Sequence, residues 1–132
     1  MTTRPSNEGD WIQKRHTRAV AWHIPEAALI AAIFLDPAPR TIVWTASLLW
    51  MGVACILNAR RCGRRHCYFT GPFFVLMGAA VTLHGSGILP LGPQGWWWLG
   101  SVLVVGGYGL LWLLPERIWG EYVARRTNTS GA

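Results

Sequence analysis

Four long apolar runs, joined by short polar or proline-rich connections, make up most of this 132-residue chain. They cover about 19–35, 41–59, 69–89 and 96–114, and the second and fourth carry no charged residue. A run such as 41–59 rises about 28 Å as an α-helix, which is close to the thickness of a bilayer's hydrocarbon core. We therefore expect an all-α membrane protein with four transmembrane helices in a compact bundle.

The first run is the weakest of the four because Pro25 and Glu26 interrupt it. A cleaved signal peptide would also be apolar, but the acidic residue and the lack of a small-x-small cleavage site before Arg40 argue against one. We expect a membrane helix that is tilted or broken at Pro25. Farther along, Thr70 and Pro72 are residue types typical of a helix N-cap and first turn, so we expect the third helix to begin there.

Short amphipathic segments are expected at both ends of the membrane domain, which we place at 19–126. Residues 1–18 are polar and basic, as in segments that lie on anionic headgroups. Residues 116–126 place apolar side chains on one side at helical spacing, which favours an interfacial helix. Residues 127–132 are expected to form a disordered tail.

Basic residues lie almost entirely on one side of the predicted membrane. Among the twelve Lys and Arg residues, Arg40 alone lies in a connection on the other side; the rest are Arg4, Lys14, Arg15, Arg18, Arg60, Arg61, Arg64, Arg65, Arg117, Arg125 and Arg126. Because short basic loops stay in the cytoplasm, this predicts a cell inner-membrane protein whose termini and 60–68 loop are cytoplasmic. The net charge of +6 does not indicate nucleic acid, since the arginines form no groove-sized patch.

The connection between the second and third runs concentrates the reactive side chains. It reads Arg60, Arg61, Cys62, Gly63, Arg64, Arg65, His66 and Cys67. If Gly63 takes a positive φ, the thiols of Cys62 and Cys67 can converge beside His66. The arginines should favour thiolate over thiol, and two thiolates suffice for a soft ion such as Hg(II) or Cu(I).

Two other interpretations of this loop stay open. The arginines can record membrane orientation alone, with the cysteines incidental. Alternatively, the guanidinium groups clamp lipid phosphates. The C-x4-C spacing differs from the C-x2-C of zinc ribbons and thioredoxin-type sites, so the spacing by itself does not select among these interpretations.

Four more candidates lie inside the apolar runs: His23, Glu26, Cys55 and His84. An ionisable residue within a span is a functional candidate by default. His23, Glu26 and Cys55 lie at the inner depth and join the loop in one candidate set, with Cys55 a further metal ligand. His84 lies toward the outer side, where it could relay protons or simply hydrogen-bond a neighbouring helix. Because His23 and His84 belong to opposite leaflets, we expect no haem, and no nucleotide-binding loop is visible.

A small, basic, multi-span chain with paired cysteines in a cytoplasmic loop and another in a span resembles the mercuric-ion transport proteins. In that family, cysteine pairs pass Hg(II) inward to a cytosolic reductase. The likeness is one of layout, carried by Cys55, Cys62 and Cys67, and the family's adjacent Cys-Cys pair in the first span is absent here. The stretch 58–74 also resembles a signature of small uncharacterised membrane proteins, which implies no particular function.

The leading hypothesis is a small membrane protein that binds, and transports or senses, a soft metal ion. The alternative is a non-catalytic accessory subunit of a larger membrane complex, or a homo-oligomer, that packs through Trp- and Gly-rich helices. No nucleophile–base–orienter set is visible, so we do not expect an enzyme.

Overall fold

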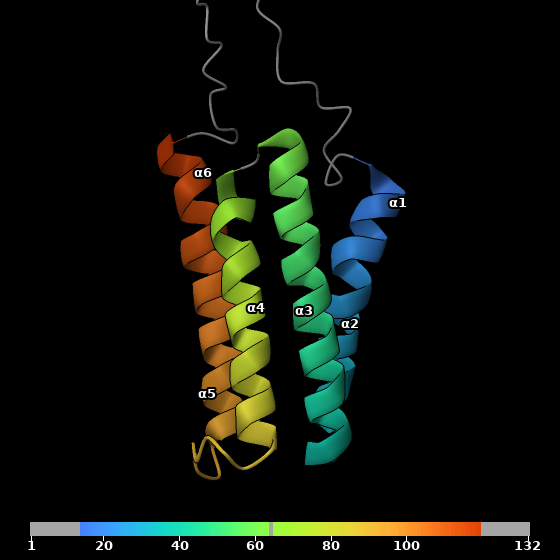
Figure 1. Ribbon diagram of the computed structural model, residues 1–132, viewed down its shortest axis with the longest axis vertical. Coiled ribbons are helices and arrows are strands. Elements are labelled where there is room, and N and C mark those ends of the chain that lie inside the picture. The colour runs from blue at the N-terminus through green and yellow to red at the C-terminus, as the bar shows by residue number, and fades with distance from the viewer. Residues whose placement is uncertain (1–13, 64, 120–132) are drawn as a thin grey trace, which may run out of the picture.

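The computed structural model describes residues 14–63 and 65–119, which are all-α and contain no strand. The helical segments follow one another along four columns that lie side by side (Figure 1). The first column contains α1 (Arg15–Arg18), η2 (Ala19–His23), α2 (Ile24–Ala31) and η3 (Ala32–Phe34). The others are α3 (Pro37–Cys62), α4 (Arg65–Gly85), and the succession of α5 (Gly95–Val102), η4 (Leu103–Leu113) and α6 (Leu114–Trp119).

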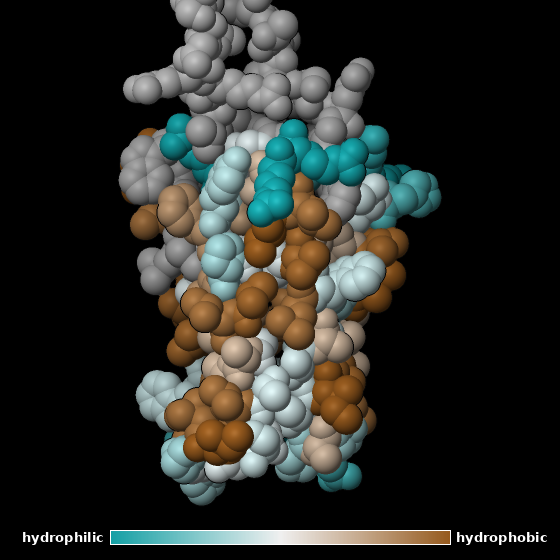
Figure 2. All heavy atoms as spheres, viewed as in Figure 1, coloured by the Kyte–Doolittle hydropathy of each residue, from teal (hydrophilic) through white to brown (hydrophobic). Residues whose placement is uncertain are grey.

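Two helices are long and apolar enough to cross a membrane: Pro37–Arg61 within α3, and α4. Large apolar side chains cover the outside of the bundle, and Ile42 and Leu76 are 70% and 69% exposed. Figure 2 shows an apolar belt across the middle of one face, with hydrophilic side chains gathered at the end where α3 passes into α4. Such a surface is costly in water and favourable in hydrocarbon, which supports an association with a membrane.

The first column changes its hydrogen-bonding pattern twice. The π-helical turn Ala19–His23 ends shortly before Pro25, which has no N–H and cannot continue the α-helical ladder. A 3-10 turn, Ala32–Phe34, ends the column. The interruption expected at Pro25 is therefore a change of register inside a continuous helical segment.

Arg40 fixes the turn between the first column and α3. Its Nε donates to the carbonyl oxygen of Ala32 at 3.3 Å, and its Nη2 donates to those of Ile33 at 2.9 Å and Leu35 at 2.6 Å. The last carbonyls of a helix lack intrahelical partners, and here the guanidinium donates hydrogen bonds to them. Arg40 therefore caps the first column.

The connection between α3 and α4 is much shorter than the expected 60–68 loop. α3 continues to Cys62 and α4 begins at Arg65, so most of that stretch is helix. Gly63 ends α3 with a φ of 69°, and its N–H donates to the carbonyl of Ala59 at 2.8 Å. Gly63 takes the positive φ that its missing β-carbon permits, and it ends the helix as a left-handed glycine commonly does.

Thr70 and Pro72 lie inside α4, so the prediction that the third helix begins there is wrong. Thr70 Oγ1 donates to the carbonyl of His66, one turn earlier, at 2.8 Å instead of capping a helix start. The turn at Gly63 has already reversed the chain, and packing against α3 extends the helix across residues whose local preference is for a first turn.

The fourth column also continues past its predicted end near 114, through α6 to Trp119. The predicted segments 1–18, 116–126 and 127–132 fall largely on residues 1–13 and 120–132, which lie outside the described part of the chain.

α3 and α4 approach each other closely at two glycines near the middle of their contact. A β-carbon on Gly71 would lie 2.7 Å from Ile56 Cγ1 and 3.3 Å from the carbonyl oxygen of Gly52. One on Gly52 would lie 2.7 Å from Val75 Cγ2. Both positions therefore need glycine, which lets two helix backbones pack against each other.

The bundle is open between its first and fourth columns. α2 packs on α3 and η4 packs on α4, whereas α2 and η4 share no close backbone contact in the described part of the chain. A cleft of about 900 Å³ lies between them. The expected bundle is therefore compact around α3 and α4 and hollow beside them.

Gly71→Ala should destabilise the protein by about 1–3 kcal/mol, because the added methyl meets Ile56 and the backbone of α3. Gly109→Ala is the matched control: nothing lies within 4 Å of a β-carbon there, and alanine favours a helix by up to about 1 kcal/mol. Reversible unfolding in mixed SDS–detergent micelles, followed by circular dichroism, compares the two. Equal effects at both glycines would contradict the close approach.

Candidate functional site

The most deeply buried polar side chains lie where the C-terminal half of α3 meets the N-terminal half of α4. Cys55 and Asn58 come from α3, and His66, Cys67 and Thr70 come from α4; none is more than 1% exposed. Cys55 and Asn58 are three residues apart and so share one helix face, opposite the first turns of α4. We call these five residues the thiol cluster.

Hydrogen bonds in the thiol cluster centre on its two sulfurs. Cys67 Sγ lies 3.3 Å from His66 Nε2 and accepts a hydrogen bond from Asn58 Nδ2 at 3.6 Å. Cys55 Sγ lies 3.7 Å from Thr70 Oγ1, whose own proton is donated to the carbonyl of His66. The side chains of Cys55 and Cys67 also interact with each other. The two thiols therefore lie close together, and neither forms a disulfide bond.

The structure brings together three of the four predicted metal-ligand candidates: Cys55, His66 and Cys67. The fourth, Cys62, is the last residue of α3, and its side chain lies outside the described part of the protein. His66 and Cys67 are buried on a helix rather than exposed at a loop tip, because α4 begins at Arg65. The described thiol pair is thus Cys55 with Cys67.

Arginines lie near the end of the thiol cluster that is next to the α3–α4 turn. Arg60 and Arg61 are exposed on the last turn of α3, Arg65 is half-buried at the start of α4, and Arg64 lies outside the described residues. A cavity of about 180 Å³ is lined by both Arg60 and Cys67. Cys67 therefore borders a small cavity that an arginine of α3 also lines.

As a metal site, the thiol cluster offers two sulfurs. No group of three or more His, Cys, Asp or Glu side chains is placed to hold a metal ion within residues 14–63 and 65–119. A structural zinc site needs four such ligands, whereas two thiolates suffice for linear coordination of Cu(I) or Hg(II).

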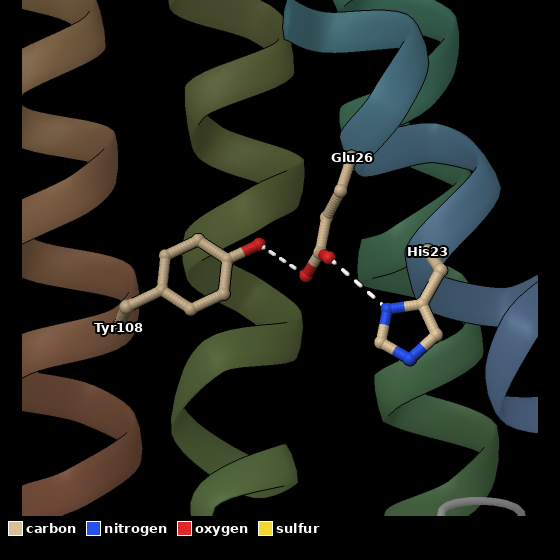
Figure 3. Close-up of polar contacts among 3 residues, drawn as sticks. All are labelled: His23, Glu26 and Tyr108. Atoms are coloured by element: carbon tan, nitrogen blue, oxygen red, sulfur yellow. Dashed lines mark hydrogen bonds and ion pairs between the residues drawn. The ribbon is translucent and has the colours of Figure 1, made fainter.

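A second polar cluster joins the first and fourth columns across the cleft (Figure 3). Tyr108 Oη donates to Glu26 Oε1 at 2.7 Å, and Glu26 Oε2 lies 3.4 Å from His23 Nδ1. His23 is exposed, while the side chain of Glu26 is only 28% exposed. A carboxyl group among apolar helices requires hydrogen-bond partners. The two sequence candidates therefore lie together, with Tyr108 as their third member.

The helix that carries Tyr108 is irregular. η4 has π-helical geometry over 11 residues. A β-carbon on Gly106 would lie 2.9 Å from Phe73 Cζ, and one on Gly107 would lie 3.1 Å from Phe74 Cε1. The absence of a β-carbon at these glycines lets the aromatic rings of α4 pack against η4. π-Helical segments often occur at functional sites.

His84 lies apart from both clusters and closes the turn after α4. Its Nδ1 is 3.0 Å from the carbonyl oxygen of Leu89, and its ring centroid is 5.2 Å from that of Trp96 in an edge-to-face contact. A β-carbon on Gly95 would lie 2.5 Å from the imidazole. These contacts favour the interpretation of His84 as a packed, hydrogen-bonding histidine over that of a proton relay.

Three residues of the two clusters were not among the sequence candidates: Asn58, Thr70 and Tyr108. Asn58 had a usable signal, since an amide in an apolar run one turn from Cys55 demands a partner. Trp22, outside both clusters, is 2% exposed and its side chain interacts with Cys55 from the first column, as no local pattern indicates. Tyr108 likewise finds its partner only through the packing of separate columns.

No family model matches this chain, and no curated protein or solved structure matches it either. The residues that the structure describes are all-α, and two of their helices are long and apolar enough to cross a membrane. The resemblance to mercuric-ion transport proteins stays a prediction.

Tyr108→Phe should destabilise the protein by about 1–3 kcal/mol, because it removes the hydroxyl that Glu26 accepts from inside the bundle. A double-mutant cycle with Glu26→Ala should give a coupling energy of about 0.5–2 kcal/mol by SDS unfolding. Tyr68→Phe, at an exposed tyrosine of α4, is the control. Additive effects of the Tyr108 and Glu26 changes would contradict the hydrogen bond.

Proposed function

We propose that this chain is a small integral membrane protein that binds one soft metal ion between Cys55 and Cys67. All four helical columns cross the membrane in this proposal, with both termini and the α3–α4 turn on the cytoplasmic side of the cell membrane. The proximity of two buried thiols that form no disulfide bond is the observation that carries the proposal.

The surroundings of the two sulfurs favour a soft ion. Asn58 donates a hydrogen bond to the sulfur of Cys67 and so stabilises a thiolate there. The cluster supplies few hard oxygen ligands of the kind that Mg²⁺ or Ca²⁺ requires. Hg(II) between two thiolates is electrically neutral, and a neutral complex has a small desolvation cost in a site that is 0–1% exposed. Cu(I) would leave one negative charge, which the nearby arginines would offset.

Metal binding to thiols releases their protons, and His66 is placed to take part. Its Nε2 lies 3.3 Å from Cys67 Sγ, within reach to accept the thiol proton in the tautomer that leaves this nitrogen unprotonated. His66 is the positioning residue here, while the two sulfurs are the ligands. The cavity bordered by Arg60 and Cys67 supports access from the cytoplasmic surface.

The charge distribution supports the proposed orientation. Arg60, Arg61 and Arg65 lie at the end of the bundle that holds the α3–α4 turn, and α1 brings further basic residues to that same end (Figure 1). Arg40 lies at the opposite end, at the start of α3. Under the positive-inside rule, the arginine-rich end is cytoplasmic.

Purified protein should bind about one Hg(II) or Cu(I) per chain, measured as thiolate-to-metal charge-transfer absorbance during titration. Cys55→Ser and Cys67→Ser should each weaken that affinity by roughly a hundredfold or more, because a hard hydroxyl is a poor substitute for a soft sulfur. Cys62→Ser is the matched control and should leave the affinity nearly unchanged.

Two outcomes of that titration would contradict the proposed ligand pair. Loss of binding in Cys62→Ser and Cys67→Ser, but not in Cys55→Ser, would place the metal at the Cys62–Cys67 pair that the sequence predicts. Unchanged affinity in both Cys55→Ser and Cys67→Ser would remove the metal site and favour a non-catalytic accessory subunit.

Topology is tested by single cysteines placed in a variant whose own three cysteines are alanine. Ser86→Cys, in the exposed turn after α4, should react with a membrane-impermeant maleimide applied to intact cells. Arg61→Cys, at an exposed position next to the α3–α4 turn, should react only after the cells are permeabilised. The reverse labelling pattern would overturn the proposed orientation.

A further inference from the structure

The cleft between the first and fourth columns has the size and walls of a binding site. Its volume of about 900 Å³ lies within the range of small-molecule sites. Leu29, Ile30 and Ile33 form one wall, and Val104 and Val105 form the other. Because no helix covers the gap between α2 and η4 in the described part of the chain, the cleft faces whatever surrounds the bundle.

One end of the cleft carries a positive charge and two indoles. The guanidinium of Arg40 lies 5.1 Å from the ring centroid of Trp96, and Trp44 lines the cleft beside them. Arg40 uses Nε and Nη2 to bond carbonyl oxygens, while its Nη1 has no hydrogen-bond acceptor among the described residues. No carboxylate among those residues forms an ion pair with Arg40. The charge is therefore without a counterion among the residues that the structure describes.

The other end of the cleft is closed by the Tyr108–Glu26 hydrogen bond of 2.7 Å. The phenol hydrogen is used by Glu26, so this end offers an incoming anion no donor. Trp96 and Tyr108 lie about three helical turns apart along the fourth column, or roughly 16 Å. The cleft is thus a long apolar channel with a cationic group at one end only.

We propose that this cleft binds one phospholipid, with an acyl chain along the apolar walls and the phosphate on Nη1 of Arg40. A guanidinium is well suited to bind phosphate, and tryptophans commonly lie at headgroup depth. The charge complementarity selects a phosphate-bearing lipid over an uncharged one. Bound there, the lipid fills the gap between α2 and η4 and links the two columns.

The first experiment uses native mass spectrometry of the full chain in detergent, with dioleoyl phosphatidylglycerol and dioleoylglycerol as probes. The wild type should bind the phospholipid at least about tenfold more tightly, because only the phospholipid offers a partner to Arg40. Equal binding of the two probes overturns the phosphate contact.

Two matched substitutions test whether the lipid occupies the cleft. Val104→Trp fills it from an exposed wall position, 60% exposed, and should weaken phosphatidylglycerol binding at least about tenfold. Val102→Trp adds the same bulk at a position on the same column that does not line the cleft, and should leave the affinity within about twofold. Retained tight binding by the Val104 variant overturns the site.

The arginines next to the α3–α4 turn, at the opposite end of the bundle, are the alternative binding site for the phosphate of phosphatidylglycerol. Arg40→Gln should lower phosphatidylglycerol binding to the level of dioleoylglycerol, whereas Arg61→Gln should not. Loss of binding in the Arg61 variant, with the Val104 variant unaffected, would place the lipid at the arginine-rich end and overturn the proposal. Because Arg40 also caps the first column, the Val104 and Val102 pair keeps the test decisive even if the Arg40 variant fails to fold.

Discussion

The rest of the structure depends on the close approach of α3 and α4 at Gly52 and Gly71. In hydrocarbon, burying apolar surface between helices gains little, so association relies on backbone packing and on hydrogen bonds between polar side chains. The two glycines permit that packing, since a β-carbon on either would lie 2.7 Å from a side chain of the other helix. One turn farther along, the same approach brings Cys55 of α3 against Cys67 of α4.

The outer columns are attached by polar contacts rather than by tight backbone packing. Arg40 caps the first column, and the Tyr108–Glu26 hydrogen bond of 2.7 Å joins it to the fourth. Because each of these groups would be costly without a partner among apolar helices, a few contacts hold columns that otherwise leave a cleft of about 900 Å³ between them. The result is a rigid central pair with a hollow beside it.

These two regions offer different chemistry to different ligands. The thiol cluster has two soft sulfurs at 0–1% exposure, next to an arginine-rich surface. The cleft has apolar walls and one guanidinium at the opposite end of the bundle. Trp22 and Glu26 lie one turn apart on the first column, and they contact the thiol cluster and the cleft respectively.

The sequence by itself determined the helical class and the apolar runs that form α3 and α4, because run length is a local property. It also singled out Cys55, His66 and Cys67 as side chains unusual for an apolar environment. Only the tertiary structure decided that α4 begins before Thr70, that Cys67 lies against Cys55, and that Glu26 meets Tyr108. Those outcomes depend on how far each helix is rotated and shifted along its neighbour, and packing between columns sets that rotation and shift.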